Sequence, residues 1–126
     1  MARKNRLWMK RPERRDCEAA LSFLSLIYPR DDAQKLVRAM RKADPVEHVA
    51  KDLLRASGLP LLPRTERHVA DDLKKLRSGE PLVPVLLVQG DLSRQRALVI
   101  ADGYHRVCAI CHYDEDAPVR CCVVKG

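Results

Sequence analysis

The segment Asp102-Gly103-Tyr104-His105-Arg106 holds the residues of this chain whose types and spacing best suit chemistry. It joins a short apolar run, predicted to be a strand, to a helical pattern over residues 104–113. The first turn of a helix has backbone N–H groups without internal partners and carries the positive end of the helix dipole. A glycine directly before that turn lets a ligand approach the backbone closely. The segment therefore predicts a site for a phosphate group.

The side chains of this segment offer further groups to the same site. His105 and Arg106 would add donors, and a guanidinium suits bidentate contact with phosphate. Asp102 could cap the helix, hold a magnesium ion or orient a substrate hydroxyl. A structural interpretation stays equally open, in which Asp102 caps the helix and Arg106 packs over the edge of the sheet.

The elements around this segment predict an α+β fold in which helices pack on a small sheet. A chain of 126 residues suits one domain of ordinary size. Hydrophobic periodicity and turn residues predict the later elements. These are a helix over residues 66–77 that Thr65 begins, strands over 85–89, 98–101 and 119–124, a polar loop over 91–96, and the helix over 104–113.

The N-terminal part of the chain favours helices. One is expected over residues 17–28 with Asp16 as its cap, and another over residues 32–42 with Asp31 as its cap. A third begins at Asp44-Pro45, with Glu47 three residues after the cap, and ends at Gly58 in the left-handed conformation. We therefore divide the chain into a basic arm (1–15), a helical N-terminal region packed on the body (16–58) and the body itself (59–126).

The body resembles the ParB/sulfiredoxin superfamily over residues 59–124. That superfamily has a helix, a strand, a hairpin, a second strand, a Gly-x-[His/Arg]-Arg motif that opens a helix, and a last strand. The resemblance rests on Pro84-Val85-Leu86-Leu87-Val88, on Leu98-Val99-Ile100-Ala101-Asp102-Gly103-Tyr104-His105-Arg106-Val107-Cys108-Ala109, and on Ala117-Pro118-Val119.

The resemblance implies a ParB/sulfiredoxin-like domain that binds a nucleotide, which is CTP in ParB, ATP in sulfiredoxin and ADP in a free-serine kinase branch. The motif of this chain is most similar to the Asp-Gly-His-His-Arg of the kinase branch. Asp102 would then lie beside the transferring phosphoryl group of a phosphotransferase or nucleotide hydrolase, with Mg²⁺ as the accompanying ion. Four residues would bind the phosphates of ATP, ADP or CTP: Gly103, Tyr104, His105 and Arg106.

A second carboxylate is implied by the kinase branch, which uses one before the first helix of the fold. Glu66 is the candidate catalytic residue, and Glu80 is the other glutamate of that region. Glu66 also has a plainer interpretation, as part of the polar first turn of the predicted helix. Tyr104 stands where sulfiredoxin has its reactive cysteine, which disfavours a sulfinic acid reductase. The helix-turn-helix domain of ParB is absent from the sequence after Gly126, so no partitioning role is expected.

Residues 1–15 carry most of the net charge of +7, because they hold seven bases and one acid. Such an arm can contact nucleic acid phosphates or an acidic partner, or can act as a solubilising tail. The alternative function is a nucleic-acid-associated accessory module with weak contact through this arm and a degenerate nucleotide site. A third is a protein whose helical first half covers another chain, although no oligomeric state is indicated. Trp8 is expected to pack onto the body.

Five cysteines form an odd set in a chain without a secretory signal, which favours reduced thiols and a cytoplasmic location. No apolar run approaches the roughly 18 residues of a membrane span. Cys108-Ala109-Ile110-Cys111-His112 matches the pattern for haem attachment, and the cysteines with His112 also raise a zinc site. Buried thiols between helix and sheet are the favoured interpretation, because Cys121 and Cys122 would point to opposite faces of a strand. No metal ligand is therefore predicted, and His48 and His68 are expected to face solvent.

Overall fold

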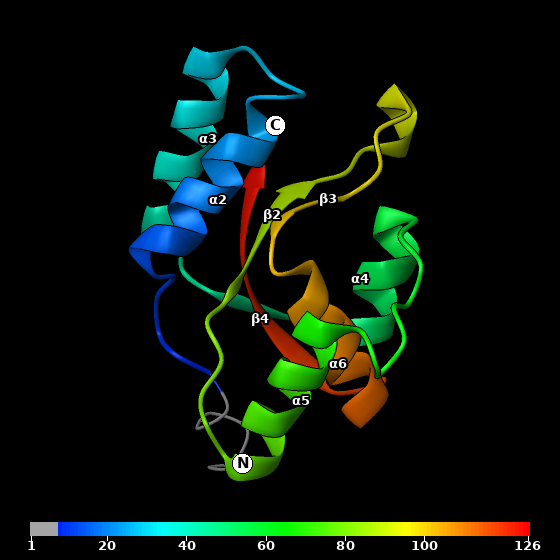
Figure 1. Cartoon of the computed structure of the whole chain (residues 1–126). Helices are drawn as coiled ribbons and strands as arrows, with labels where there is room; N and C mark the ends of the chain where they lie inside the picture. Colours follow the sequence, from blue (N-terminus) through cyan, green and yellow to red (C-terminus); the bar gives the residue numbers. More distant parts are fainter. Residues whose placement is uncertain (1–7) are drawn as a thin grey trace.

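A four-stranded mixed sheet forms the centre of the computed structural model, which describes residues 8–126 (Figure 1). Its strands are β1 (Val46–Val49), β2 (Val85–Gln89), β3 (Val99–Asp102) and β4 (Pro118–Lys125), in the spatial order β1-β4-β2-β3. Strands β2 and β4 run parallel, whereas the β1–β4 and β2–β3 pairs are antiparallel. Five α-helices of the described part accompany this sheet, which confirms the predicted α+β class.

Helices cover both faces of the sheet. Helices α2 (Arg14–Leu24) and α3 (Arg30–Lys42) pack on one face. Helices α4 (Ala50–Ser57), α5 (Arg67–Ser78) and α6 (Tyr104–Tyr113) lie on the other. Two separate hydrophobic cores result, one on each side of the sheet.

Strand β2 lies between β4 and β3 and is buried on both faces from Val85 to Val88. Successive side chains of a strand point to opposite faces, so Leu87 enters the core under α4–α6 and Leu86 enters the core under α2 and α3. Cys121 and Cys122 on β4 divide in the same way, which confirms the prediction made for them. An unbroken apolar run indicated this doubly covered strand correctly.

The helix predicted from Asp44 to Gly58 is wrong in its first half. Residues 46–49 form strand β1, which pairs with β4 from Val46 opposite Cys121 to Val49 opposite Pro118, and α4 begins only at Ala50. The capping pattern around Pro45 is a local signal, and pairing with the otherwise open edge of β4 outweighs it. The β-branched Val46 and Val49 suit the extended conformation. The left-handed end at Gly58 is confirmed by its φ of 70°.

Other helix boundaries shift by a few residues. Helix α2 begins at Arg14 after Glu13, so Asp16 lies within its first turn rather than at the cap. Pro29 precedes α3 in place of the predicted cap Asp31, and Glu66 caps α5 in place of Thr65. The helix over 104–113 and the strand over 85–89 have the predicted bounds. The division of the chain at residue 58 stays a prediction.

The first part of the basic arm, residues 1–7, lies outside the described residues. Trp8 is buried and forms a bridge with Leu82, where the N–H of Met9 donates to the Leu82 carbonyl at 2.7 Å. The expectation that Trp8 packs onto the body is therefore confirmed. Among the described residues, no helix combines the length and apolar character needed to cross a membrane.

Candidate functional site

The segment 102–106 forms the corner between β3 and α6. Asp102 is the last residue of β3, and Gly103, with φ 104°, precedes the first helical residue, Tyr104. No side chain caps the N-terminus of α6. The N–H groups of its first turn also have no partner within the helix. The corner thus has the backbone arrangement that the sequence predicts.

Arg106 is held between two carboxylates. Its Nη2 lies 2.7 Å from Asp102 Oδ2, and its Nη1 lies 3.3 Å from Oδ1 of Asp16 on α2. All three side chains are largely buried, and Arg106 Nε is buried without a hydrogen-bond partner. This is the packing over the edge strand β3 that the structural interpretation of Arg106 describes. Phosphate binding by Arg106 stays a prediction.

The guanidinium of Arg106 also occupies the space beside Gly103. A Cβ atom at Gly103 would lie 2.7 Å from Arg106 Nη2 and 3.0 Å from a methyl group of Val85. The glycine therefore makes room for an arginine of its own chain on that side, whereas the sequence analysis expected a ligand there. Its positive φ gives a second reason for the residue type.

Burial raises the pKa of Asp102 to about 6. The charge of Arg106 acts in the opposite direction, and the hydrogen bond and negative charge of Asp16 add to the increase. Asp102 can therefore exchange a proton close to neutral pH, a property common among groups at functional sites.

A polar hollow of about 500 Å³ adjoins this corner. Asp102, Gly103, His105 and Arg106 line it, together with residues of α2, α5 and the segment before β2. We call it the acidic pocket, because carboxylates outnumber the bases with a permanent charge. The carboxylates are those of Glu13, Asp16, Asp71, Asp72 and Asp102, and the bases are Arg15, Lys75 and Arg106.

Two of the predicted site residues do not line the acidic pocket. The hydroxyl of Tyr104 donates instead to the carbonyl of Pro60. Glu66 caps α5: its Oε1 accepts from the N–H groups of His68 at 2.8 Å and Val69 at 2.9 Å. The hydrogen bond from Val69, followed by those from His68, lowers the pKa of Glu66 against the effect of desolvation. The plainer interpretation of Glu66 thus describes its local role.

Glu66 also meets two histidines that the sequence analysis left without partners. His68 Nδ1 lies 3.3 Å from Glu66 Oε2, and His105 Nε2 lies 4.0 Å from Glu66 Oε1. The two imidazole rings stack with their centroids 4.7 Å apart. The expectation that His68 merely faces solvent was therefore incomplete. The available signal was one histidine in the predicted first turn of each of two helices, one of them following Glu66.

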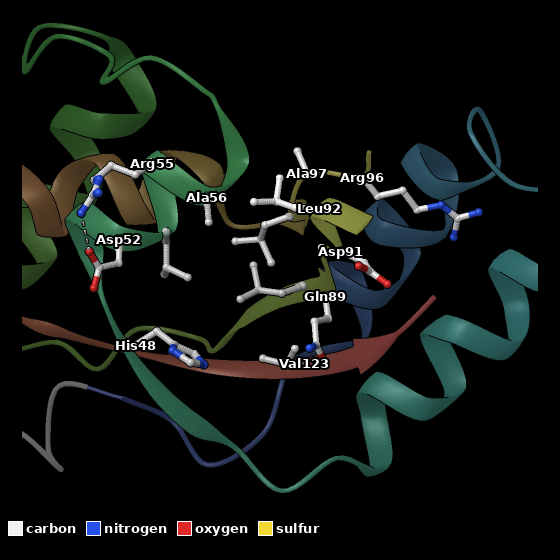
Figure 2. A pocket seen from close by; sticks show the side chains of 14 residues that line it. His48, Asp52, Arg55, Ala56, Gln89, Asp91, Leu92, Arg96, Ala97 and Val123 are labelled. Atoms are coloured by element: carbon white, nitrogen blue, oxygen red, sulfur yellow. Dashed lines mark hydrogen bonds and ion pairs between the residues drawn. The ribbon is translucent and has the colours of Figure 1, made fainter. Parts of the chain in front are cut away.

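A second hollow, of about 640 Å³, lies between α4, the β2–β3 hairpin and strand β4 (Figure 2). We call it the apolar pocket, because side chains such as Leu53, Leu87 and Val123 line it. Arg55, paired with Asp52, stands at one end, and Arg96 stands at the other. None of the predicted site residues lines this pocket.

The cysteines pack as small apolar residues. Cys108, Cys121 and Cys122 are fully buried, Cys111 is partly exposed, and all five thiols are free. Burial raises the pKa of Cys121 to about 12, so this group remains a neutral thiol. The favoured interpretation of buried thiols between helix and sheet is thus confirmed for these three cysteines. His112 contacts the Leu62 carbonyl through Nε2 at 2.6 Å.

No family model, curated protein or solved structure matches this chain. The resemblance to the ParB/sulfiredoxin superfamily therefore stays a prediction that rests on the segment 102–106 and the order of the elements around it.

Proposed function

We propose that the protein binds a magnesium–nucleotide complex in the acidic pocket. The observation that carries this proposal is the N-terminus of α6, which has no side-chain cap and whose first-turn residues His105 and Arg106 line the pocket. Free amides at a helix N-terminus favour a phosphate group. A volume of about 500 Å³ is also within the usual range for small-molecule sites.

The charges around the pocket support a metal complex rather than a free phosphate. Five carboxylates and three permanently charged bases line it, so an uncomplexed polyphosphate would meet an excess of negative charge. Mg²⁺ removes that conflict, and carboxylate oxygens are its preferred protein ligands. Asp71 and Asp72 on α5 are the carboxylates outside the Asp16–Arg106–Asp102 network that would hold it.

The remaining residues have distinct parts in this proposal. The amides of the first turn of α6 and the His105 side chain bind phosphate oxygens. Arg106 supplies positive charge beside them while it keeps Asp102 and Asp16 in place. Asp102 is the candidate to exchange a proton with a substrate, because burial raises its pKa to about 6. Glu66 does not line the pocket and has no catalytic step here.

A cytoplasmic location belongs to the same proposal. The five cysteines are free, which agrees with a reducing compartment, and magnesium nucleotides are abundant there. Transfer of the phosphoryl group is not part of the proposal, which concerns binding.

Thermal unfolding with ATP, ADP and CTP, each with Mg²⁺ or with EDTA, tests the proposal. A nucleotide at 100 times its dissociation constant should stabilise the fold by about 2.7 kcal/mol when Mg²⁺ is present, and by clearly less with EDTA. If none of the three raises the melting temperature at millimolar concentration with Mg²⁺, the proposal is wrong.

Two neighbouring lysines of α5 provide a matched pair of variants. Lys75 lines the acidic pocket, whereas Lys74 is exposed and lies outside it. Lys75→Ala should weaken nucleotide binding, and Lys74→Ala should leave it unchanged. Equal binding by the two variants would place the nucleotide elsewhere. This pair is preferable to Arg106→Ala, because removal of Arg106 leaves two buried carboxylates without a cation.

A further inference from the structure

Three metal-ligating side chains meet where the first turns of α5 and α6 approach each other. Glu66 caps α5, His68 lies in its first turn, and His105 lies in the first turn of α6. Their ligating atoms all lie within 4.8 Å of one another. Among the described residues this is the one such group, and it lies apart from the cysteines that raised a zinc site in the sequence.

We propose that Glu66, His68 and His105 form a binding site for a divalent transition metal of the zinc class. Two imidazole nitrogens with one carboxylate oxygen suit Zn²⁺, Co²⁺ or Ni²⁺, whereas Mg²⁺ prefers oxygen ligands alone. The site is therefore distinct from the magnesium expected in the acidic pocket. It does not depend on nucleotide binding.

The distances between the ligating groups fit a tetrahedral ion. Zinc bonds of about 2.0–2.2 Å place neighbouring ligand atoms roughly 3.3–3.5 Å apart. The separation of 3.3 Å between Glu66 and His68 has this value, and that of 4.0 Å between Glu66 and His105 exceeds it slightly. The His68 and His105 side chains are 60% and 42% exposed, so small rotations can close the remaining gap.

The carboxylate is already oriented before any ion binds. Glu66 Oε1 is held by the amides of His68 and Val69, which leaves Oε2 directed toward His68 Nδ1. Hydrogen bonds of this kind fix the direction of a metal-binding carboxylate. They also favour its ionised form, the form that binds a cation, because they lower the pKa of Glu66.

Three protein ligands leave a fourth position open to water or to another ligand, as in zinc sites that are not purely structural. His68 and His105 both line the acidic pocket, so the ion would lie at its wall. A ligand atom from the contents of that pocket can therefore reach the open position.

Zinc titration of the full chain, stripped with EDTA and dialysed, tests the site without Mg²⁺ or nucleotide. Competition with a colorimetric zinc chelator gives the stoichiometry and affinity, and Co²⁺ substitution gives a visible spectrum that reports tetrahedral coordination. We expect one ion per chain. His68→Ala and His105→Ala should each weaken binding by roughly tenfold to a hundredfold or more, since even loss of a supporting partner has effects of that size.

Two controls make the result specific. His48 on β1 is exposed and distant in the fold from α5 and α6, so His48→Ala should bind zinc as the unchanged chain does. Cys111→Ser removes the most accessible thiol and should also retain binding. Circular dichroism verifies folding of each variant, and His105→Gln replaces His105→Ala if the latter unfolds.

Unchanged affinity in both His68→Ala and His105→Ala, or loss of binding in Cys111→Ser, would overturn the proposal. A chain that binds no zinc would do the same. Because the nucleotide experiment uses Mg²⁺ without zinc, failure of one proposal leaves the result for the other readable.

Discussion

Arg106 on α6 forms an ion pair with Asp16 on α2, at 3.3 Å and ninety residues away in the sequence. The two helices lie on opposite faces of the sheet, so the pair connects two layers whose hydrophobic cores are separate. The same guanidinium binds Asp102 at 2.7 Å, while Asp16 also accepts the N–H of Glu13 at 3.0 Å. A single arginine therefore fixes the corner at residues 102–106 against the start of α2.

Arg106→Ala should lower the free energy of unfolding by about 3–5 kcal/mol. Removal of one member of a largely buried ion pair leaves uncompensated charge, and here two carboxylates lose their cation. Denaturant unfolding measured by circular dichroism checks the value. Arg14→Ala is the control, because the Arg14–Glu18 pair is almost fully exposed and its loss should change stability little. Similar curves for the two variants would contradict a structural role for Arg106.

The pH dependence of stability should carry the signature of Asp102. Its pKa is raised from 3.8 to about 6, so the folded state binds the proton more tightly than the unfolded chain does. Its contribution is therefore complete below about pH 4 and is lost as the pH rises through about 6.

Comparison with Asp102→Asn isolates this contribution. The difference in unfolding free energy between the unchanged chain and the variant should fall by about 1–2 kcal/mol between pH 4 and pH 7. Asp72, whose pKa burial also raises, is present in both chains and cancels. A difference that increases with pH would mean that Arg106 outweighs burial at Asp102.

Gly103→Ala should destabilise the fold more than Gly79→Ala. Both glycines have positive φ, at 104° and 78°, so both substitutions strain the backbone. A Cβ at Gly79 meets nothing within 4 Å, whereas one at Gly103 meets Arg106 and Val85. We expect a loss of about 1 kcal/mol for Gly79→Ala and roughly two to three times as much for Gly103→Ala, measured by thermal unfolding. Equal losses would show that Arg106 moves aside without cost.

Alkylation of the thiols should follow their exposure. Cys111 is partly exposed, and the other four cysteines are buried. Burial raises the pKa of every thiol, most clearly that of Cys121 to about 12, and only the thiolate is reactive. Iodoacetamide followed by mass spectrometry should modify Cys111 first, faster at higher pH, and Cys121 only after unfolding. Early modification of Cys108 would contradict its place in the core.

Local sequence patterns were sufficient for the elements that carry the site. The run Val85–Gln89 and the helical pattern after Gly103 each have a periodicity that one segment of chain can express alone, and the structure has both with the predicted bounds. Gly58 and Gly79 end helices in the left-handed conformation for the same reason. The α+β class followed from these elements.

The contacts between distant segments were decided only by the tertiary structure. Residues 46–49 become a strand because β4 offers them an edge, although their own pattern favours a helix. Arg106 meets Asp16, and His105 meets His68 and Glu66, because the packing of helices on the sheet brings together residues that are 37 to 90 positions apart. The sequence thus determined which backbone elements the protein has, since these depend on neighbouring residues. Which charged side chains face one another depends on how those elements pack.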